Sequence, residues 1–133
     1  DQILSTGSVK LFKSYDDDYG HGEQMRDFVY VKDVIDMMMW FFQNSNQQGL
    51  FNAGTGEARS FLDLANAVFQ SLNKKPVIKF VDTPSSIRDK YQYETQADMK
   101  KIRDSGYEKK PMTLEEGIFD YVNNYLETED KYL

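Results

Sequence analysis

Arg26 is the residue of this chain whose type and position most clearly suit ligand binding, because it stands just before an apolar run that ends at Val31. A guanidinium stays charged at any working pH, and its planar fork of N–H donors matches phosphate oxygens. We therefore expect Arg26 to lie at the mouth of a strand and to bind a phosphorylated ligand. A salt bridge to Asp27 or Asp33 is an alternative that these residues leave open.

A second candidate segment is the turn Asn52-Ala53-Gly54-Thr55-Gly56. Its glycines permit positive φ angles and a close approach, and we expect this structural role to dominate, because two glycines one residue apart are weak evidence for a ligand loop. The sequence contains no G-x-G-x-x-G cofactor fingerprint and no Tyr-x-x-x-Lys acid/base pair. We therefore assign no cofactor-binding residue and no catalytic residue.

The acidic stretch 14–24 carries Asp16, Asp17, Asp18 and His21 between glycines. Oxygen donors at close spacing suit a hard cation, but adjacent carboxylates on a loop are more typical of a solvated acidic turn. The single histidine could act as a general base, yet no serine or cysteine pattern nearby offers it a nucleophile. We assign no metal ligand.

Length and composition limit the class of protein. With 133 residues, 40% hydrophobic and 14% aromatic, the chain is expected to form one domain, 1–133, with a real core. A net charge of −6 without a basic stripe argues against a nucleic-acid partner. The absence of cysteine excludes disulfides, and the longest apolar stretch, Val34 to Phe42, is too short to span a bilayer. We expect a soluble, cytoplasmic protein.

Hydrophobic periodicity and turn residues predict a small α/β unit in which strands and helices alternate. The expected strands cover residues 9–12, 28–31, 50–52 and 77–81. The expected helices are one capped by Asp33, one capped by Ser60 with Asp63, a short one from Asp98 to Gly106, and one capped by Thr113 with Glu116. The charged tail 127–133 is expected to fray.

The helix after Asp33 carries a stripe of methionine and phenylalanine that we expect to pack in the core. The stripe consists of Val34, Met37, Met38, Phe41 and Phe42. The inner faces expected for the second and the final helix are Leu64, Ala65, Val68 and Leu72, and Ile118, Tyr121, Val122, Tyr125 and Leu126.

The order and spacing of four segments resemble the back half of extended short-chain dehydrogenases/reductases that act on nucleotide sugars. These segments are RDFVYV at 26–31, NAGTG at 52–56, KYQYETQADM at 90–99 and KIRDSGY at 101–107. The Tyr-Gln-x-x-Thr-Gln-Ala-Asp form at 91–98 is similar to the ADP-L-glycero-D-manno-heptose 6-epimerase family in particular. The resemblance implies a small substrate-binding C-terminal domain of a nucleotide-sugar epimerase, without the Rossmann domain that would bind NADP or, less often, NAD.

The resemblance also implies roles for single residues. Arg26 would contact the diphosphate of the sugar nucleotide, and Tyr91 would touch the substrate. Phe12 would belong to the segment that closes over the nucleotide. The chain departs from the family between Lys13 and Gln24, where an acidic stretch is inserted, so Ser14 is carried over to the substrate site with less support.

For the whole enzyme, the resemblance implies an NADP-dependent isomerase of the bacterial cytoplasm that is homo-oligomeric. It would convert ADP-D-glycero-D-manno-heptose to ADP-L-glycero-D-manno-heptose for the lipopolysaccharide inner core, with the hydride chemistry supplied by the cofactor. The start Asp1-Gln2-Ile3-Leu4 is unlike a natural N-terminus, so we expect a fragment of a longer protein. Without the cofactor motif and the Tyr-x-x-x-Lys pair, this piece alone is expected to be inactive.

Two alternatives remain open from the sequence. The parent could be a 4-epimerase or 4,6-dehydratase of the same superfamily that acts on a UDP-, GDP- or dTDP-sugar. Alternatively, the 133 residues could be a complete module without catalytic activity that binds nucleotides, or that binds a partner protein through the Met-rich helix.

Overall fold

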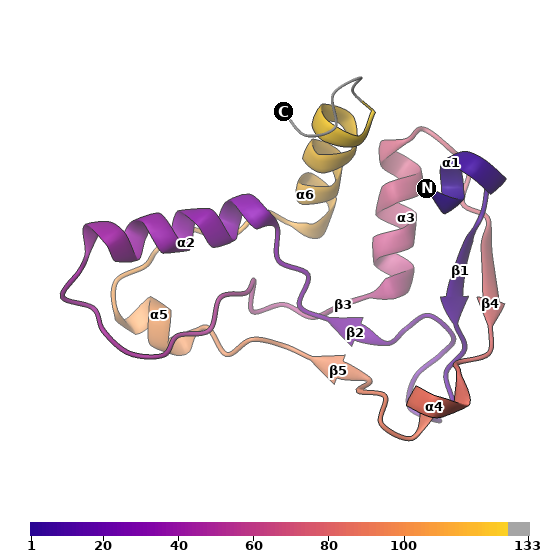
Figure 1. The fold of residues 1–133 in the computed structure, drawn as a ribbon, viewed down its shortest axis with the longest axis horizontal. Helices are drawn as coiled ribbons and strands as arrows, with labels where there is room; N and C mark the ends of the chain where they lie inside the picture. Colours follow the sequence, from indigo (N-terminus) through magenta and orange to yellow (C-terminus); the bar gives the residue numbers. More distant parts are fainter. Residues whose placement is uncertain (128–133) are drawn as a thin grey trace.

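Two short parallel strands form one edge of the molecule in the computed structural model, which describes residues 1–127 (Figure 1). Strand β1 (Val9–Phe12) pairs with β4 (Ile78–Val81), with Val9 opposite Ile78. The strand predicted at 9–12 is confirmed, and the strand predicted at 77–81 begins one residue later than expected.

A second sheet of three two-residue strands lies at the centre of the molecule. Strand β2 (Met25–Arg26) pairs antiparallel with β3 (Arg59–Ser60) and parallel with β5 (Glu94–Thr95). Arg26 therefore lies within a strand, between two segments that are distant in the sequence.

Within residues 1–127, six helices and one π-helical turn complete the fold. They are α1 (Gln2–Thr6), α2 (Val31–Gln43), α3 (Phe61–Ser71), α4 (Ser85–Arg88), α5 (Lys100–Asp104), α6 (Leu114–Tyr121) and the turn η1 (Val122–Leu126). Both predicted capping boxes are confirmed: the Ser60 and Asp63 side chains close the start of α3, and Thr113 and Glu116 close the start of α6. No helix within residues 1–127 is long and apolar enough to cross a membrane.

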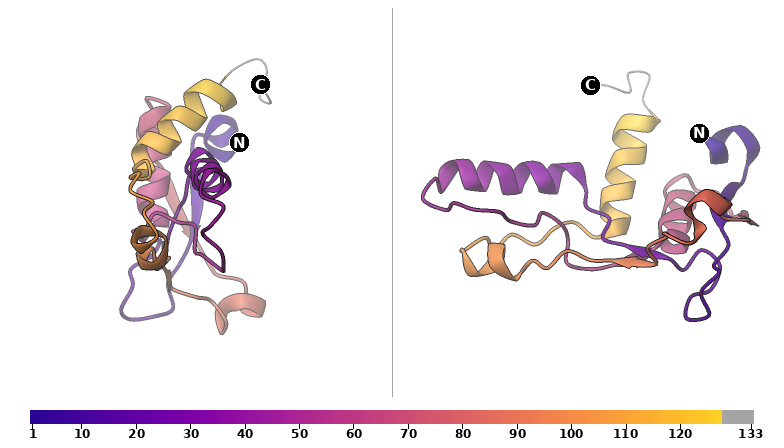
Figure 2. Two further views of the ribbon diagram at one scale, coloured as in Figure 1. Left: turned by 90° about the vertical axis from the view of Figure 1, so that its left-hand side faces the viewer. Right: turned by 60° about the horizontal axis from the view of Figure 1, so that its bottom comes forward.

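The helices gather at two ends of the molecule (Figures 1 and 2). Helices α3 and α6 pack side by side near β1 and β4, whereas α2 and α5 extend to the opposite end. A buried cluster joins this second pair and consists of Met37, Met99, Ile102 and Tyr107. The three-stranded sheet lies between the two ends, so it connects both halves of the fold.

Two predicted strands are wrong. Residues 28–30 form irregular backbone that leads into α2, and residues 50–52 form no strand.

The prediction that Asp33 caps the helix is also wrong: Tyr30 occupies that position, with φ −79° and ψ 141°. The Asp33 carboxylate lies one turn inside α2, where it is 2% exposed and accepts a hydrogen bond from the Met112 N–H at 3.1 Å. It therefore ties α2 to the segment before α6.

The predicted core stripe of α2 is wrong in part. Met37 is buried, as expected, but Met38 and Phe42 are 64% and 80% exposed. The helical repeat of 3.6 residues separates them: Met37 and Phe41 face the buried cluster, while Met38 and Phe42 lie about a quarter turn away. The tail predicted at 127–133 lies outside the described residues, apart from Glu127.

The Asp27 side chain connects the end of β2 to the 52–56 turn and to the segment after β5 through hydrogen bonds. Its Oδ1 accepts hydrogen bonds from the Thr55 N–H (2.8 Å) and hydroxyl (2.6 Å), and its Oδ2 accepts from the Gly56 N–H (2.9 Å) and the Ala97 N–H (3.1 Å). Gly54 lies against this network: a Cβ there would stand 2.6 Å from the Ala97 Cβ and 2.7 Å from Asp27 Oδ2. The turn at 52–56 therefore needs its first glycine for close packing.

We expect Gly54→Ala to lower the free energy of unfolding of the intact protein by about 1–3 kcal/mol, because the new methyl group overpacks the Asp27 network. Gly20→Ala is the matched control, since its Cβ would meet only the flexible carboxyl end of Glu23. Urea denaturation of both variants measures the difference. Equal stability of the two would contradict the packing role of Gly54.

Candidate functional site

Two of the four predicted substrate residues, Phe12 and Tyr91, line a small cavity of about 180 Å³, and a third, Arg26, lies beside the Tyr91 ring. The Phe12 and Tyr91 rings stand edge to face with centroids 6.4 Å apart, and the Arg26 guanidinium carbon lies 5.4 Å from the Tyr91 centroid. The cavity is lined by Lys10, Leu11, Phe12, Gln24, Phe61 and Tyr91. Strand β1, strand β2 and the segment before β5 thus bring a cation and two aromatic rings together.

Arg26 forms no ion pair within residues 1–127. Its Nη1 donates to the Met25 carbonyl (2.6 Å) and its Nη2 donates to the Gln92 carbonyl (2.5 Å). The two carboxylates that the sequence offered as partners, Asp27 and Asp33, accept hydrogen bonds from backbone N–H groups elsewhere. The salt-bridge alternative is therefore wrong for this structure, and the positive charge of Arg26 is not neutralised by a neighbouring side chain.

Ser14 does not line the cavity. Its hydroxyl donates to the Asp16 carbonyl at 2.9 Å, and its N–H donates to His21 Nδ1 at 3.1 Å. Both bonds close the turns of the 14–24 loop. A substrate contact by Ser14 stays a prediction, and the structure gives it a role within the loop.

The sequence interpretation missed two residues of the cavity, Gln24 and Phe61. Gln24 is 2% exposed, and its amide donates to the carbonyls of Phe12 (3.4 Å) and Lys13 (3.3 Å). Phe61 begins α3, and its ring centroid lies 5.8 Å from the Arg26 guanidinium carbon. No local signal could have identified Gln24, because a buried glutamine looks like any loop glutamine. Phe61 follows a capping serine, which predicts the helix start but not its neighbours.

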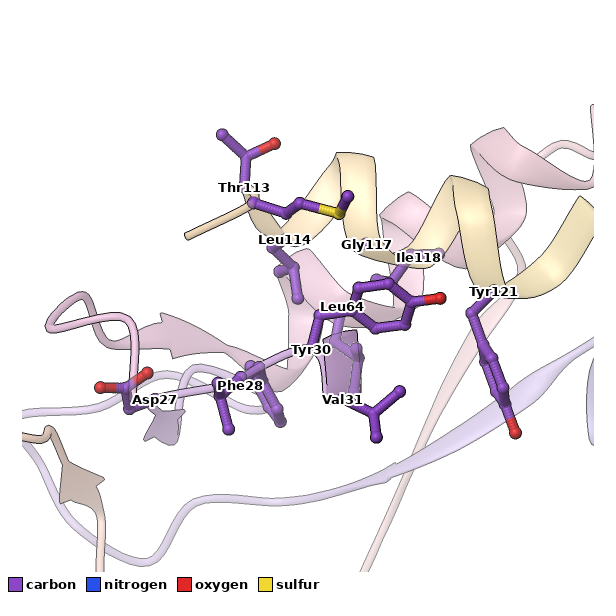
Figure 3. A pocket seen from close by; sticks show the side chains of 12 residues that line it. Asp27, Phe28, Tyr30, Val31, Leu64, Thr113, Leu114, Gly117, Ile118 and Tyr121 are labelled. Carbon is purple, nitrogen blue, oxygen red and sulfur yellow. The ribbon is translucent and has the colours of Figure 1, made fainter. Parts of the chain in front are cut away.

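A second, larger hollow of about 690 Å³ lies between the start of α2 and helix α6 (Figure 3). The side chains around it are mostly apolar, and Figure 3 shows Leu64, Leu114 and Ile118 gathered near the Tyr30 ring, with Asp27 at one edge. The two Asp27 oxygens are already occupied by their four hydrogen bonds. The chemistry of this hollow suits apolar side chains better than a charged ligand.

The Tyr30 hydroxyl beside this hollow is not an acid/base group at neutral pH. Burial, together with the hydrogen bond that the hydroxyl donates to Asp120 (2.5 Å), raises the pKa of Tyr30 to about 12. Lys32 also donates to Asp120, at 2.6 Å, and its bond is the main cause that lowers the pKa of Asp120 to about 2. The three side chains fix α6 to the start of α2.

The glycine turn offers no phosphate cradle, because Asp27 already accepts from the N–H groups of Thr55 and Gly56. Among the described residues, Arg26 can meet an anionic ligand beside the flat Tyr91 and Phe61 rings, and Lys10 adds a second cation in the lining of the cavity.

Comparison with known proteins identifies the family of this chain. The family model described as GDP-mannose 4,6 dehydratase matches residues 7–114. The chain belongs to the GDP-mannose 4,6-dehydratase family. This match contains all four predicted substrate residues and the Asp27 network.

Relatives of this chain with established names are heptose epimerases. The ADP-L-glycero-D-manno-heptose-6-epimerase of Fusobacterium nucleatum is 47% identical over 138 residues, which cover 99% of this chain and 42% of that protein. The crystal structure of the Helicobacter pylori enzyme of the same name matches with a TM-score of 0.70 and 29% identity, over 92% of this chain and 34% of that one. The resemblance to heptose 6-epimerases that the sequence predicted is confirmed.

The fold itself is shared more widely. A dTDP-glucose 4,6-dehydratase from Bacillus anthracis matches with a TM-score of 0.72 at 17% identity, over 96% of this chain and 37% of that one. The predicted fold class, a small α/β unit of the epimerase and dehydratase type, is therefore confirmed. The chain spans about two fifths of the length of the Fusobacterium relative.

We expect Asp27→Asn to lower the free energy of unfolding by about 1–3 kcal/mol near pH 7, because an amide NH₂ group would face N–H donors that now bind a carboxylate oxygen. Burial alone would raise the pKa of Asp27, but the bonds from Thr55, Gly56 and Ala97 lower it below its ordinary value of 3.8. The contribution is therefore present above that ordinary pKa and is lost as pH falls through the folded pKa.

Denaturation of the wild type and of Asp27→Asn across a pH series measures this difference, which should shrink below pH 3.8. Asp98→Asn is the control, because this exposed carboxylate accepts from the Lys100 N–H at the start of α5. A gap between wild type and Asp27→Asn that stays constant down to low pH would contradict the role of the ionised carboxylate.

Proposed function

We propose that this chain is the substrate-binding part of an NADP-dependent epimerase that converts ADP-D-glycero-D-manno-heptose to ADP-L-glycero-D-manno-heptose for the lipopolysaccharide inner core. The observation that carries the proposal is the charge of Arg26, which has no ion-pair partner within residues 1–127 and lies beside the Tyr91 and Phe61 rings, with Phe12 next to Tyr91. A guanidinium binds a diphosphate through charge-assisted hydrogen bonds, and aromatic rings bind the flat nucleoside. The identity of the sugar in this proposal is taken from the names of the relatives.

In this proposal Arg26 binds the diphosphate while Tyr91 and Phe12 enclose the nucleoside. Catalysis then depends on groups outside these residues, because the chain holds neither a glycine-rich fingerprint nor a Tyr-x-x-x-Lys pair. NADP, or NAD, would be held by a separate domain and would supply the hydride chemistry. The contribution of this part is binding energy and orientation of the sugar at the cofactor.

One face of α2 supports the presence of such a second domain. Five apolar residues recur at helical spacing along this face and are 49–80% exposed: Val31, Ile35, Met38, Met39 and Phe42. Val31 also lines the large apolar hollow, so the face and the hollow are continuous. Exposed apolar area of this kind marks an interface. We propose that the cofactor-binding domain covers it.

A second candidate is favoured by the breadth of the fold match. The dTDP-glucose 4,6-dehydratase fits the chain as well in TM-score as the heptose epimerase does, so the fold does not select the sugar. A 4-epimerase or 4,6-dehydratase that acts on a UDP-, GDP- or dTDP-sugar would use the same arginine. Turnover of ADP-heptose against these sugar nucleotides separates the two candidates.

The experiment that tests the proposal is Arg26→Ala in the intact protein. We expect the Kd of the ADP-sugar to rise about 10- to 100-fold, because hydrogen bonds to a charged group contribute about 1.5–3 kcal/mol. The Kd of NADP should not change. Isothermal titration with each ligand measures both constants.

Arg103→Ala is the matched control, since Arg103 also donates to two backbone carbonyls, those of Tyr107 and Lys109, but lies in α5. An ADP-sugar Kd that is the same in Arg26→Ala and in the wild type would refute the assignment.

A further inference from the structure

The acidic loop 14–24 is bound to the segment that carries Tyr91. The Tyr15 N–H donates to the Tyr93 hydroxyl at 2.9 Å, and the Tyr15 hydroxyl donates to Asp82 at 3.1 Å. Further along the loop, the Tyr19 hydroxyl donates to Glu94 at 3.2 Å. Two hydrogen bonds, between residues 78 and 75 positions apart, therefore join the loop to this segment, and a third ties the loop to Asp82 after β4.

Tyr93 stands between the loop and the cavity wall. Its ring centroid lies 5.2 Å from that of Tyr19 in the loop and 5.5 Å from that of Tyr91. Tyr91 in turn contacts Phe12 and Arg26. Aromatic contacts at these separations are directional, so the position of one ring restricts the next. A displaced Tyr93 therefore shifts the ring proposed to touch the substrate.

The base of the loop is also held. The buried Gln24 amide donates to the Phe12 and Lys13 carbonyls, and the Thr83 hydroxyl donates to the Lys13 carbonyl at 3.0 Å. Beside it, the Arg88 guanidinium carbon lies 3.9 Å from the Tyr15 ring centroid. These contacts hold the two ends of the loop. Its middle is held by the hydrogen bonds to Tyr93 and Glu94.

We propose that the 14–24 loop helps to set affinity for the nucleoside end of the substrate, with Tyr93 as the positioning residue that couples the loop to Tyr91. The inference rests on the proposed function, since it concerns the same nucleotide site. Tyr93 acts through its neighbours: its hydroxyl accepts a hydrogen bond from the Tyr15 N–H, and its ring contacts the rings of both Tyr19 and Tyr91.

The test compares Tyr93→Phe with Tyr93→Leu in the intact enzyme, using ADP-heptose as substrate. Tyr93→Phe removes only the hydroxyl that accepts from Tyr15, so we expect the KM to rise about 3- to 10-fold, the effect of one neutral hydrogen bond. Tyr93→Leu also removes the ring and should raise KM further. In both variants kcat should stay within about twofold of the wild type, because no reacting group is touched.

A second measurement reports on the loop itself. Hydrogen exchange of the peptide that contains the Tyr15 amide should be faster in Tyr93→Phe than in the wild type, because this amide loses its acceptor. Tyr121→Phe, in α6, is the control for loss of a tyrosine hydroxyl elsewhere.

The outcomes separate this inference from the proposed function. An unchanged KM in Tyr93→Phe, or a fall in kcat without a change in KM, overturns the positioning role even if Arg26→Ala weakens substrate binding. If Arg26→Ala leaves substrate binding intact, the proposed function itself fails. Tyr93→Phe keeps the ring and the packing, so the test does not depend on whether Tyr93→Leu folds.

Discussion

The carboxylate of Asp27 is the interaction on which the centre of this fold depends. Its four hydrogen bonds hold the 52–56 turn and the segment after β5 against β2. Two-residue strands provide few ladder bonds of their own, so a side chain that binds backbone N–H groups supplies much of the connection. Because these segments must reach the same carboxylate, Gly54 and Ala97 approach it closely.

The placement of Asp27 also explains why Arg26 remains available. Neighbouring residues of opposite charge could have neutralised each other, but successive residues of an extended chain point to opposite faces. Asp27 is occupied by N–H donors on one side, and Arg26 lies beside Tyr91 and Phe61 on the other. Asp27 therefore serves the fold, and Arg26 is the residue to which we assign ligand binding in the proposed function.

Local signals predicted much of the fold. The capping boxes of Ser60 with Asp63 and of Thr113 with Glu116 depend on residues three positions apart, and both were confirmed. The strands expected at 28–31 and 50–52 were wrong, because residues 28–31 line the large hollow and Phe51 packs against the buried cluster, instead of covering a sheet face. The same distinction holds for the cavity. Residues in recognisable motifs could be predicted from the sequence, whereas Gln24 and Phe61 reach the cavity only through contacts between segments that are distant in the sequence.

The two carbonyl bonds of Arg26 have a consequence for the entropy of binding. A guanidinium has five N–H donors, and the bonds to Met25 and Gln92 engage Nη1 and Nη2 while leaving other donors free. An unrestrained arginine would lose up to about 2 kcal/mol of rotamer freedom when a ligand immobilises it. Here that loss has already occurred on folding, so in the proposed function the diphosphate would meet a side chain that needs little further ordering.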